Sequence, residues 1–269
     1  DGDKDLYAQR INSSGNVQWG SGGVKVTNLA NDDQAQRLTS DGAGGIILVW
    51  ENYNSSGGAN AIYAQRLNAS GVAQWSPADG VNMVPAPAWP GKPADPEIVP
   101  DGSNGAIIVF NTRAGLSTGD LYMQRVDGSG NILWGNAGVM LSNQNQLESG
   151  WIIEPDGSGN FYISWSDQRE LSWPGPTYGT NYDIYAQKID VNGNKLWNAD
   201  GLLVCNADSL QYTPDMLVDG DGNLVLIWRD DRNISSNRDV YAQKVDGSGV
   251  AQWAANGVPV SLASNDQYQ

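Results

Sequence analysis

Few residues in this 269-residue chain could carry acid–base or nucleophilic chemistry. It contains no His, which removes Ser-His and Cys-His catalytic pairs, imidazole proton transfer and most transition-metal sites. The single cysteine, Cys205, excludes an intrachain disulfide and a structural zinc cluster, and we interpret it as a buried, inert thiol. Carboxylates are plentiful: 30 Asp+Glu outnumber 15 Lys+Arg and give a net charge of -15. This balance argues against a nucleic-acid partner or an anionic membrane, because phosphate contacts need clustered cations.

The best arranged oxygen ligands lie at Asp219, Asp221 and Asn223, on alternate positions of one predicted turn. Such triplets open the loops that wrap calcium. The downstream bidentate acid of an EF-hand is absent, and turn formation by the Asp-Gly pair already explains the pattern. We therefore predict no cofactor, and calcium at these three residues stays an open alternative.

The arginines recur at fixed places rather than forming one cluster. One set follows an apolar run, and a second set shares its position with two lysines. The members are Arg113, Arg169 and Arg232 in the first set and Arg10, Arg66, Arg125, Lys188 and Lys244 in the second. A catalytic site is unique within an array, so repetition favours a structural role in which these cations bind loop carbonyls and carboxylates.

A repeat of near-constant length positions all of these side chains. The segment around Tyr7 returns four times, with spacings between successive tyrosines of 56, 59, 63 and 56 residues, and a tryptophan stands 12 residues after each tyrosine. The tyrosines are Tyr7, Tyr63, Tyr122, Tyr185 and Tyr241, and a third marker falls at Trp50, Phe110, Trp165 and Trp228. We place the repeats near residues 1–34, 35–93, 94–146, 147–209 and 210–269.

Each repeat predicts four short strands, which we name a, b, c and d. Strand b is the apolar run that ends at the third marker, as in Gly45 to Trp50, and strand c carries the tyrosine. Between a and b lies an Asp-Gly pair, which favours φ > 0 and a tight hairpin. These pairs are Asp41-Gly42, Asp101-Gly102, Asp156-Gly157 and Asp219-Gly220.

Four-stranded antiparallel units of similar length, with almost no helix signal, predict an all-β β-propeller in a single domain spanning 1–269. An extended β-solenoid is the alternative. The chain opens just before a strand c, so we expect five blades of which the first has only strands c and d. Its missing hairpin would come from a longer chain or from a neighbouring copy in a homo-oligomer.

A glutamine recurs in the middle of strand c, at Gln9, Gln65, Gln124, Gln187 and Gln243. A buried amide is costly unless it is paired. We therefore expect each one to bond backbone groups, with the next blade as one candidate partner.

The repeats resemble those of propellers related to the sialidase, or Asp-box, superfamily. The resemblance rests on Trp165-Ser166-Asp167-Gln168-Arg169, on Trp228-Arg229-Asp230-Asp231-Arg232 and on the turn from Asp127 to Trp134. That turn departs from a true Asp-box, because four positions rather than three separate Gly130 from Trp134. Similar tandem repeats occur in large secreted or surface-anchored bacterial proteins, so the resemblance implies an extracellular or cell-surface setting.

A sialidase-type enzyme would need three arginines on a substrate carboxylate, a Tyr-Glu nucleophile pair and an acidic Asp. The glutamates are Glu51, Glu97, Glu148, Glu154 and Glu170, and none has an evident tyrosine partner by spacing. We therefore predict no catalytic residues and no enzymatic activity, with a divergent glycosidase as an alternative.

Two insertions break the repeat, one in a d-to-a connection and one in a b-to-c connection. They contain Trp89 and the pair Trp173 and Tyr178. In an antiparallel blade both connections emerge on the same face, together with Asp167, Arg169, Asp231 and Arg232. Aromatic side chains on Pro-rich loops suit sugar rings or partner proteins. The opposing interpretation is that each tryptophan covers its own blade.

These observations predict a non-enzymatic extracellular propeller that binds carbohydrate or a partner protein through this face, without membrane insertion. The predicted ligand-binding residues are Trp89, Trp173, Tyr178, Asp167, Arg169, Asp231 and Arg232. The second alternative is a self-assembling surface or filament protein whose incomplete blade is filled by a neighbouring chain.

Overall fold

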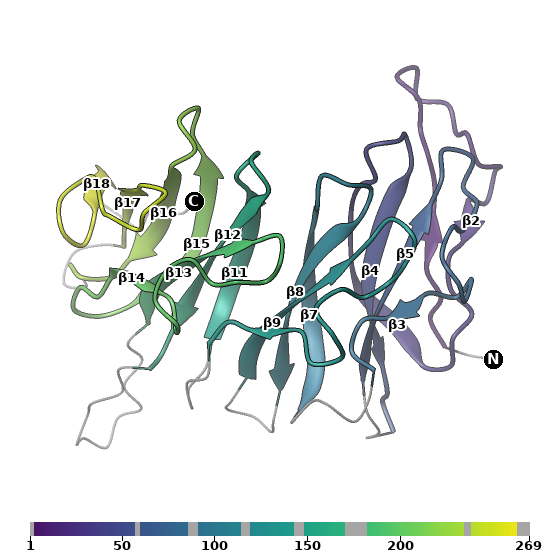
Figure 1. Ribbon diagram of the computed structural model, residues 1–269, viewed down its shortest axis with the longest axis horizontal. Helices are drawn as coiled ribbons and strands as arrows, with labels where there is room; N and C mark the ends of the chain where they lie inside the picture. Colours follow the sequence, from purple (N-terminus) through teal and green to yellow (C-terminus); the bar gives the residue numbers. More distant parts are fainter. Residues whose placement is uncertain are drawn as a thin grey trace. The chain divides into compact units, whose positions relative to one another are not determined.

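The computed structural model describes residues 3–56, 60–85, 91–113, 119–142, 148–169, 182–233 and 238–262, with only the backbone described at Arg113 and Thr213. Within these residues every regular element is a β-strand, and no helix is long and apolar enough to cross a membrane (Figure 1).

Four sheets each contain four antiparallel strands in chain order. The first is β3 (Asp32–Ser40), β4 (Ile46–Tyr53), β5 (Ala61–Leu67) and β6 (Val81–Asn82). The second is β7 (Lys92–Pro100), β8 (Ala106–Arg113), β9 (Gly119–Val126) and β10 (Val139–Met140). The third is β11 (Glu148–Pro155), β12 (Asn160–Asp167), β13 (Asp183–Asp190) and β14 (Leu202–Cys205). The fourth is β15 (Gln211–Val218), β16 (Leu224–Asp230), β17 (Asp239–Val245) and β18 (Val258–Ser261).

A fifth, two-stranded sheet joins β1 (Tyr7–Ala8) to β2 (Val24–Lys25), which correspond to strands c and d. The predicted a-b-c-d order is therefore confirmed in each four-stranded sheet. The architecture is all-β and consistent with a β-propeller.

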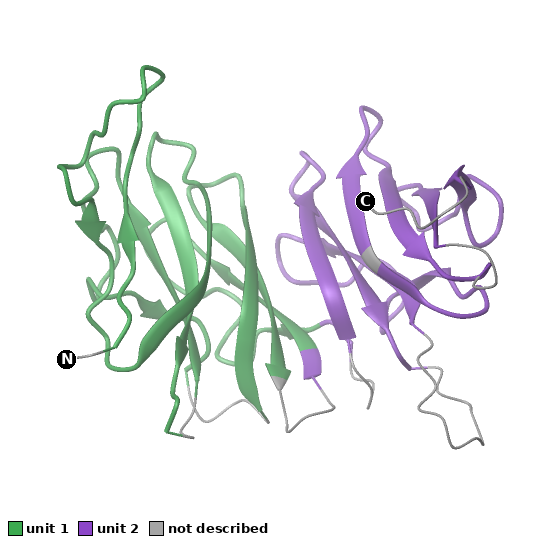
Figure 2. Ribbon diagram, turned by 180° about the vertical axis from the view of Figure 1, so that it is seen from behind, with its two compact units in different colours: residues 1–116, 121–140 green, residues 117–120, 141–269 purple. Residues whose placement is uncertain are grey.

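The chain forms two compact units, coloured separately in Figure 2. Unit 1 comprises residues 1–116 and 121–140 and contains the sheets β1–β2 and β3–β6 and nearly all of β7–β10. Unit 2 comprises residues 117–120 and 141–269 and contains the sheets β11–β14 and β15–β18. The single-domain assignment and its repeat boundaries stay predictions.

The repeated Tyr and Trp markers form the core of each sheet. Trp165 on β12 is fully buried, lies opposite Tyr185 on β13 and stacks on it with 6.2 Å between ring centroids. Gly201 lies against the same indole with φ +94°, and a Cβ there would come within 2.6 Å of Trp165. The glycine is thus required both by its backbone conformation and by the close approach of the ring.

The strand c glutamines bond backbone groups, as predicted, but within their own repeat rather than on the next one. Gln187 donates to the Asn198 carbonyl at 2.6 Å and accepts from the Trp197 amide at 3.0 Å. The amide therefore fastens the c-d turn to strand c. The tryptophan that stands 12 residues after the strand c tyrosine makes the contact to the following repeat instead. The Trp75 indole donates to the Gly128 carbonyl at 3.1 Å.

The Asp of each a-b turn anchors the turn and pairs with the strand c cation. Asp41 accepts the amides of Ala43 and Gly45 and pairs with Arg66 at 3.0 Å. The predicted positive φ is found at Gly42, Gly102 and Gly157. The fourth turn differs, because its positive φ falls on Gly222 rather than Gly220; there the Gly222 amide closes the turn onto the Asp219 carbonyl.

Candidate active site

A row of three carboxyl groups crosses the sheet β11–β14 at one end. Glu148 on β11 is the register partner of Asp167 on β12, and Asp167 is the partner of Asp183 on β13. Directly opposed residues of an antiparallel pair project to the same face with Cβ atoms about 5 Å apart. The fold therefore places three acids side by side, all nearly inaccessible to solvent.

The equivalent rows of the other sheets carry fewer acids. They are Asp33–Asn52–Ala61 in the sheet β3–β6, Pro93–Thr112 on β7 and β8, and Gln211–Asp230–Asp239 in the sheet β15–β18. Among the rows whose register is described, three acids occur in one sheet only. The site is thus a local departure from the repeat.

Glu148 has the most perturbed environment of the row. Its side chain is 2% exposed, and neither carboxyl oxygen makes a hydrogen bond of good geometry with the described residues. Burial, reinforced by the charges of Asp167 and Asp120, raises the pKa of Glu148 to about 8, although the nearby Ser142 hydroxyl favours the charged form. Glu148 is therefore largely protonated at neutral pH.

Three donors fix the position of the Asp167 carboxyl group. The Trp165 indole donates to one carboxylate oxygen at 2.9 Å, and the Arg169 amide donates to the other at 2.8 Å. The Arg169 guanidinium pairs with Asp167 at 2.5 Å and covers the Tyr185 ring at 3.7 Å. A protonated acid beside a second, firmly held carboxyl group on the adjacent strand is the kind of pair that cleavage of a glycosidic bond uses.

The predicted ligand-binding residues divide into three groups. Asp167 and Arg169 form the ion pair just described. Asp231 accepts from the Tyr212 hydroxyl at 2.7 Å and pairs with Arg238 at 3.6 Å. Three predicted ligand-binding residues, Trp89, Trp173 and Tyr178, lie outside the described residues.

Arg232 repeats the arrangement of Arg169 in the sheet β15–β18. Its guanidinium pairs with Asp230 at 2.6 Å, donates to the Asn256 carbonyl at 2.8 Å and covers the Tyr241 ring at 3.7 Å. Both arginines bind a carboxylate, as predicted for a structural role, and Arg232 also binds a loop carbonyl.

The residues predicted to hold calcium make other bonds. Asp219 accepts the amides of Asp221 and Asn223, both at 2.9 Å, and pairs with the Lys244 ammonium at 2.6 Å. The Lys244 side chain holds the pKa of Asp219 well below its usual range. No group of three Asp, Glu or Cys side chains in the described part of the chain could hold a metal ion. Calcium at this turn stays a prediction, and the adjacent ammonium opposes it.

Several carbohydrate-cleaving enzymes of known structure share this fold. The GH93 α-L-arabinofuranosidase of Fusarium graminearum, solved with arabinobiose, matches with a TM-score of 0.54 and 9% identity over 95% of this chain and 72% of that one. The α-L-arabinanase of Penicillium chrysogenum, also with arabinobiose, matches with a TM-score of 0.52 and 11% identity over 94% and 78%. A PL25 ulvan lyase matches with a TM-score of 0.52 and 12% identity over 86% of this chain and 59% of that one. At these identities the likeness establishes a fold shared with β-propeller-like glycoside hydrolases.

No protein-family model matches the chain, and no curated protein matches it in sequence. The structural matches nevertheless overturn the prediction of a non-enzymatic module and of no enzymatic activity, because the proteins that share the fold are glycoside hydrolases and a polysaccharide lyase.

The sequence analysis missed Glu148 because it sought a tyrosine partner for each glutamate. The residue type at this strand a position varies from repeat to repeat. The position equivalent to Glu148 holds Asp33, Pro93 and Gln211 in the other repeats, so the packing of the sheet does not require one residue type there. A polar position that varies within a repeat array was the feature to follow.

Proposed function

We propose that this chain is a carbohydrate-active enzyme of the glycosidase type, with Glu148 as its proton donor. The observation that carries the proposal is the buried, protonated carboxyl of Glu148 in register with Asp167, whose carboxyl group is fixed by the Trp165 indole and by Arg169. The fold shared with arabinan-cleaving enzymes supports α-L-arabinosyl linkages as the first substrate class to test.

In the proposed reaction Glu148 gives its proton to the glycosidic oxygen as the bond from that oxygen to the anomeric carbon breaks. A carboxylate of the same row, Asp167 or Asp183, either attacks the anomeric carbon or accepts a proton from the attacking water. Arg169 acts as a positioning residue, because it fixes the Asp167 carboxylate and is itself packed on Tyr185.

Chain connectivity supports a role for the insertion that follows Arg169. Trp173 and Tyr178 belong to the connection between β12 and β13, the two strands that carry Asp167 and Asp183. We propose that these aromatic residues bind the sugar rings beside the cleaved bond.

The proposal is tested with an aryl α-L-arabinofuranoside and arabino-oligosaccharides. Replacing Glu148 by Gln should lower kcat by about 100-fold or more, since proton donation contributes about 10²–10⁴ in rate. Glu154→Gln, on the same strand β11 but outside the row, should retain activity. Wild-type protein that cleaves none of a panel of neutral and uronic-acid polysaccharides would refute the proposal, as would full activity of the Glu148→Gln variant.

The remaining expectations belong to the same proposal. We propose an extracellular or cell-surface enzyme related to Asp-box propellers, with five blades of which β1–β2 is the incomplete one. A hairpin from a longer chain or from a second copy would complete it. Light scattering of the purified protein distinguishes a monomer from such an assembly.

A further inference from the structure

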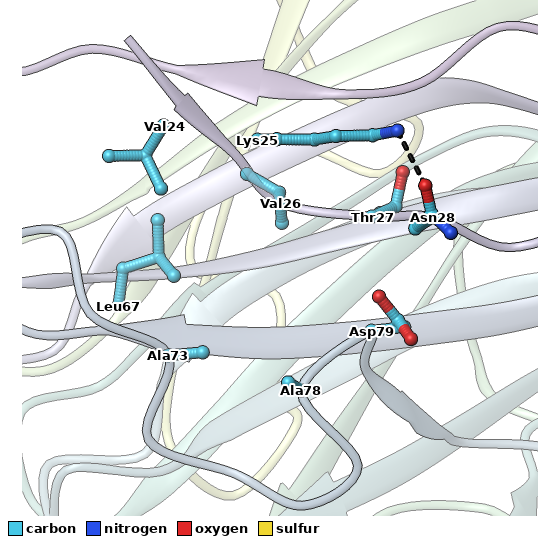
Figure 3. A pocket seen from close by; sticks show the side chains of 9 residues that line it. All are labelled: Val24, Lys25, Val26, Thr27, Asn28, Leu67, Ala73, Ala78 and Asp79. Atoms are coloured by element: carbon cyan, nitrogen blue, oxygen red, sulfur yellow. Dashed lines mark hydrogen bonds between the residues drawn. The ribbon is translucent and has the colours of Figure 1, made fainter.

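A pocket of about 180 Å³ lies in unit 1, and its lining includes none of the candidate site residues described above. Figure 3 shows its two sides: β2 and the residues after it, and the c-d turn of the following sheet with the end of β5. The apolar part is formed by Val24, Val26, Leu67 and Ala73, and the polar rim carries Asp79. A pocket with an apolar wall and a carboxylate at its rim suits a ligand that has an apolar part and a positively charged part.

The Asp79 carboxylate has no partner among the residues that the structure describes, although its side chain is partly buried. The other charged group of the pocket, the Lys25 ammonium, is already compensated. It lies 2.8 Å from Asp5 and donates to the Asn28 side chain at 2.7 Å. The unbalanced charge in the pocket is therefore negative.

The same place in the fourth repeat is filled by a lysine side chain of the protein itself. Ala73 bridges to Leu67 as Lys195 bridges to Ile189, so the two positions are equivalent. The Lys195 ammonium donates to the carbonyls of Leu141 at 2.9 Å and Ala199 at 2.5 Å. Asp200, which contributes a favourable charge to Lys195, is the counterpart of Asp79.

The equivalences follow from the glycine that packs under each core tryptophan. Gly80 lies against Trp50 as Gly201 lies against Trp165, which aligns Ala78 and Asp79 with Ala199 and Asp200. The residue paired with the strand c tyrosine aligns Val26 with Val204. Leu141 holds the same position one repeat before Val204. Each of these places therefore lies between strand d of one repeat and the c-d turn of the next.

The fifth repeat closes this place in another way. There Asn256 is the counterpart of Asp79, and its side-chain oxygen accepts the Asn206 amide at 3.1 Å. In these two repeats the polar groups at this place are satisfied from within the protein, by the Lys195 ammonium in one and by the bond of Asn256 in the other. In the second repeat, Ala73 removes the lysine and Asp79 makes no bond.

We propose that the pocket at Asp79 binds a primary alkylammonium group, in the manner that the fourth repeat binds the ammonium of Lys195. The alkyl chain would pass Leu67 and Ala73, and the ammonium would meet the Asp79 carboxylate and the carbonyls of Val26 and Ala78. The ligand class is a lysine-like amine, and the site does not depend on the proposed catalytic function.

The probe is n-butylammonium, titrated into the full chain and followed by two-dimensional NMR at neutral pH. We expect saturable shifts at residues around Asp79 with a Kd in the millimolar range, as few ligand atoms are buried. n-Butanol, which has the same shape without the charge, should bind at least about fivefold more weakly. Glucosamine separates a lysine-like amine from an amino sugar.

Two variants test the mechanism. Asp79→Asn should weaken n-butylammonium binding by about five- to tenfold while the spectrum of the free protein stays folded. Ala73→Lys should supply the ammonium from within, abolish binding and raise Tm; Ala73→Met, which fills the pocket without charge, should abolish binding without the pH dependence of a lysine. Equal binding of butanol and butylammonium, tighter binding of glucosamine, or unchanged binding in Asp79→Asn would each overturn the proposal.

Discussion

The buried carboxyl of Glu148 should make the stability of the protein fall as the pH rises. The pKa of this group is raised by burial from its usual 4.5 to about 8, so the folded state holds a proton that the unfolded state releases. Stability from the neutral carboxyl is fully present below about pH 4.5 and is lost progressively as the pH rises through about 8. At about 1.4 kcal/mol per pH unit, the whole interval is worth about 5 kcal/mol.

Urea unfolding of the wild type and of Glu148→Gln at pH 5, 7 and 9 measures this effect. The amide has the shape of the protonated acid and does not titrate, so the difference between the two proteins isolates Glu148 from all other groups. We expect the free energy of unfolding of the wild type to fall relative to the variant by about 4 kcal/mol between pH 5 and pH 9. Parallel profiles would refute the raised pKa and, with it, the assignment of Glu148 as a neutral proton donor.

Three further predictions concern the contacts that hold the repeat. Arg232→Met should lower the free energy of unfolding by about 3–5 kcal/mol, because it strands the buried Asp230 carboxylate, whereas Arg37→Met at an exposed pair with Glu97 should cost less than about 1 kcal/mol in chemical denaturation. Gln187→Leu should cost about 2–4 kcal/mol, since it leaves the buried amides of Lys188 and Trp197 and the Asn198 carbonyl without their side-chain partner; the same change at the partly exposed Gln9 should cost less, and equal losses would contradict the role of burial. Trp75→Phe should remove the indole bond to Gly128 and lower Tm by a few degrees, corresponding to about 1 kcal/mol, and an unchanged Tm in calorimetry would show that this bond does not hold neighbouring repeats together.

The strand order could be predicted because each marker has one physical cause that recurs. The tryptophan of strand b stacks on the tyrosine of the next strand, as Trp50 stacks on Tyr63 with 6.1 Å between ring centroids. Both residues are therefore recognisable in the sequence of each repeat that has them. The glycine at the start of strand d follows from the same ring. These constraints are local to one sheet, so spacing alone carries them.

The first halves of the a strands were harder to predict. Strand β7 begins at Lys92, but its register shifts between Ala94 and Glu97, and Asp95 there adopts φ 50°. The bulge breaks the alternation of polar and apolar residues on which strand prediction depends. A similar shift between Ser149 and Ile152 separates Glu148 from the apolar part of β11.

The candidate site could not be predicted for a related reason. Glu148, Asp167 and Asp183 are neighbours only through the register of three strands, and the spacing of the acids along the chain does not reveal that the end of the row is buried. Asp167 was identified through its motif, but the motif is equally present at Asp230, where the neighbouring strand a residue is Gln211. What distinguishes the two sheets is a single side chain.

That difference connects the two proposals. In a repeat array the packing of each sheet dictates the same polar residue at the same place, and there it finds the same partner, as Asp41 finds Arg66 and Asp219 finds Lys244. A polar group that departs from its equivalents has no partner supplied by the repeat, and burying it costs free energy that nothing else in the sheet recovers. Glu148 departs in this way from Gln211 and keeps its proton, whereas Asp79 matches its counterpart Asp200 in type but lacks the lysine that Asp200 faces at Lys195. Selection for stability alone would favour a neutral side chain at both positions, as Gln211 and Asn256 provide in the fifth repeat, so the acids at these positions indicate functions for which the charge or the proton itself is needed.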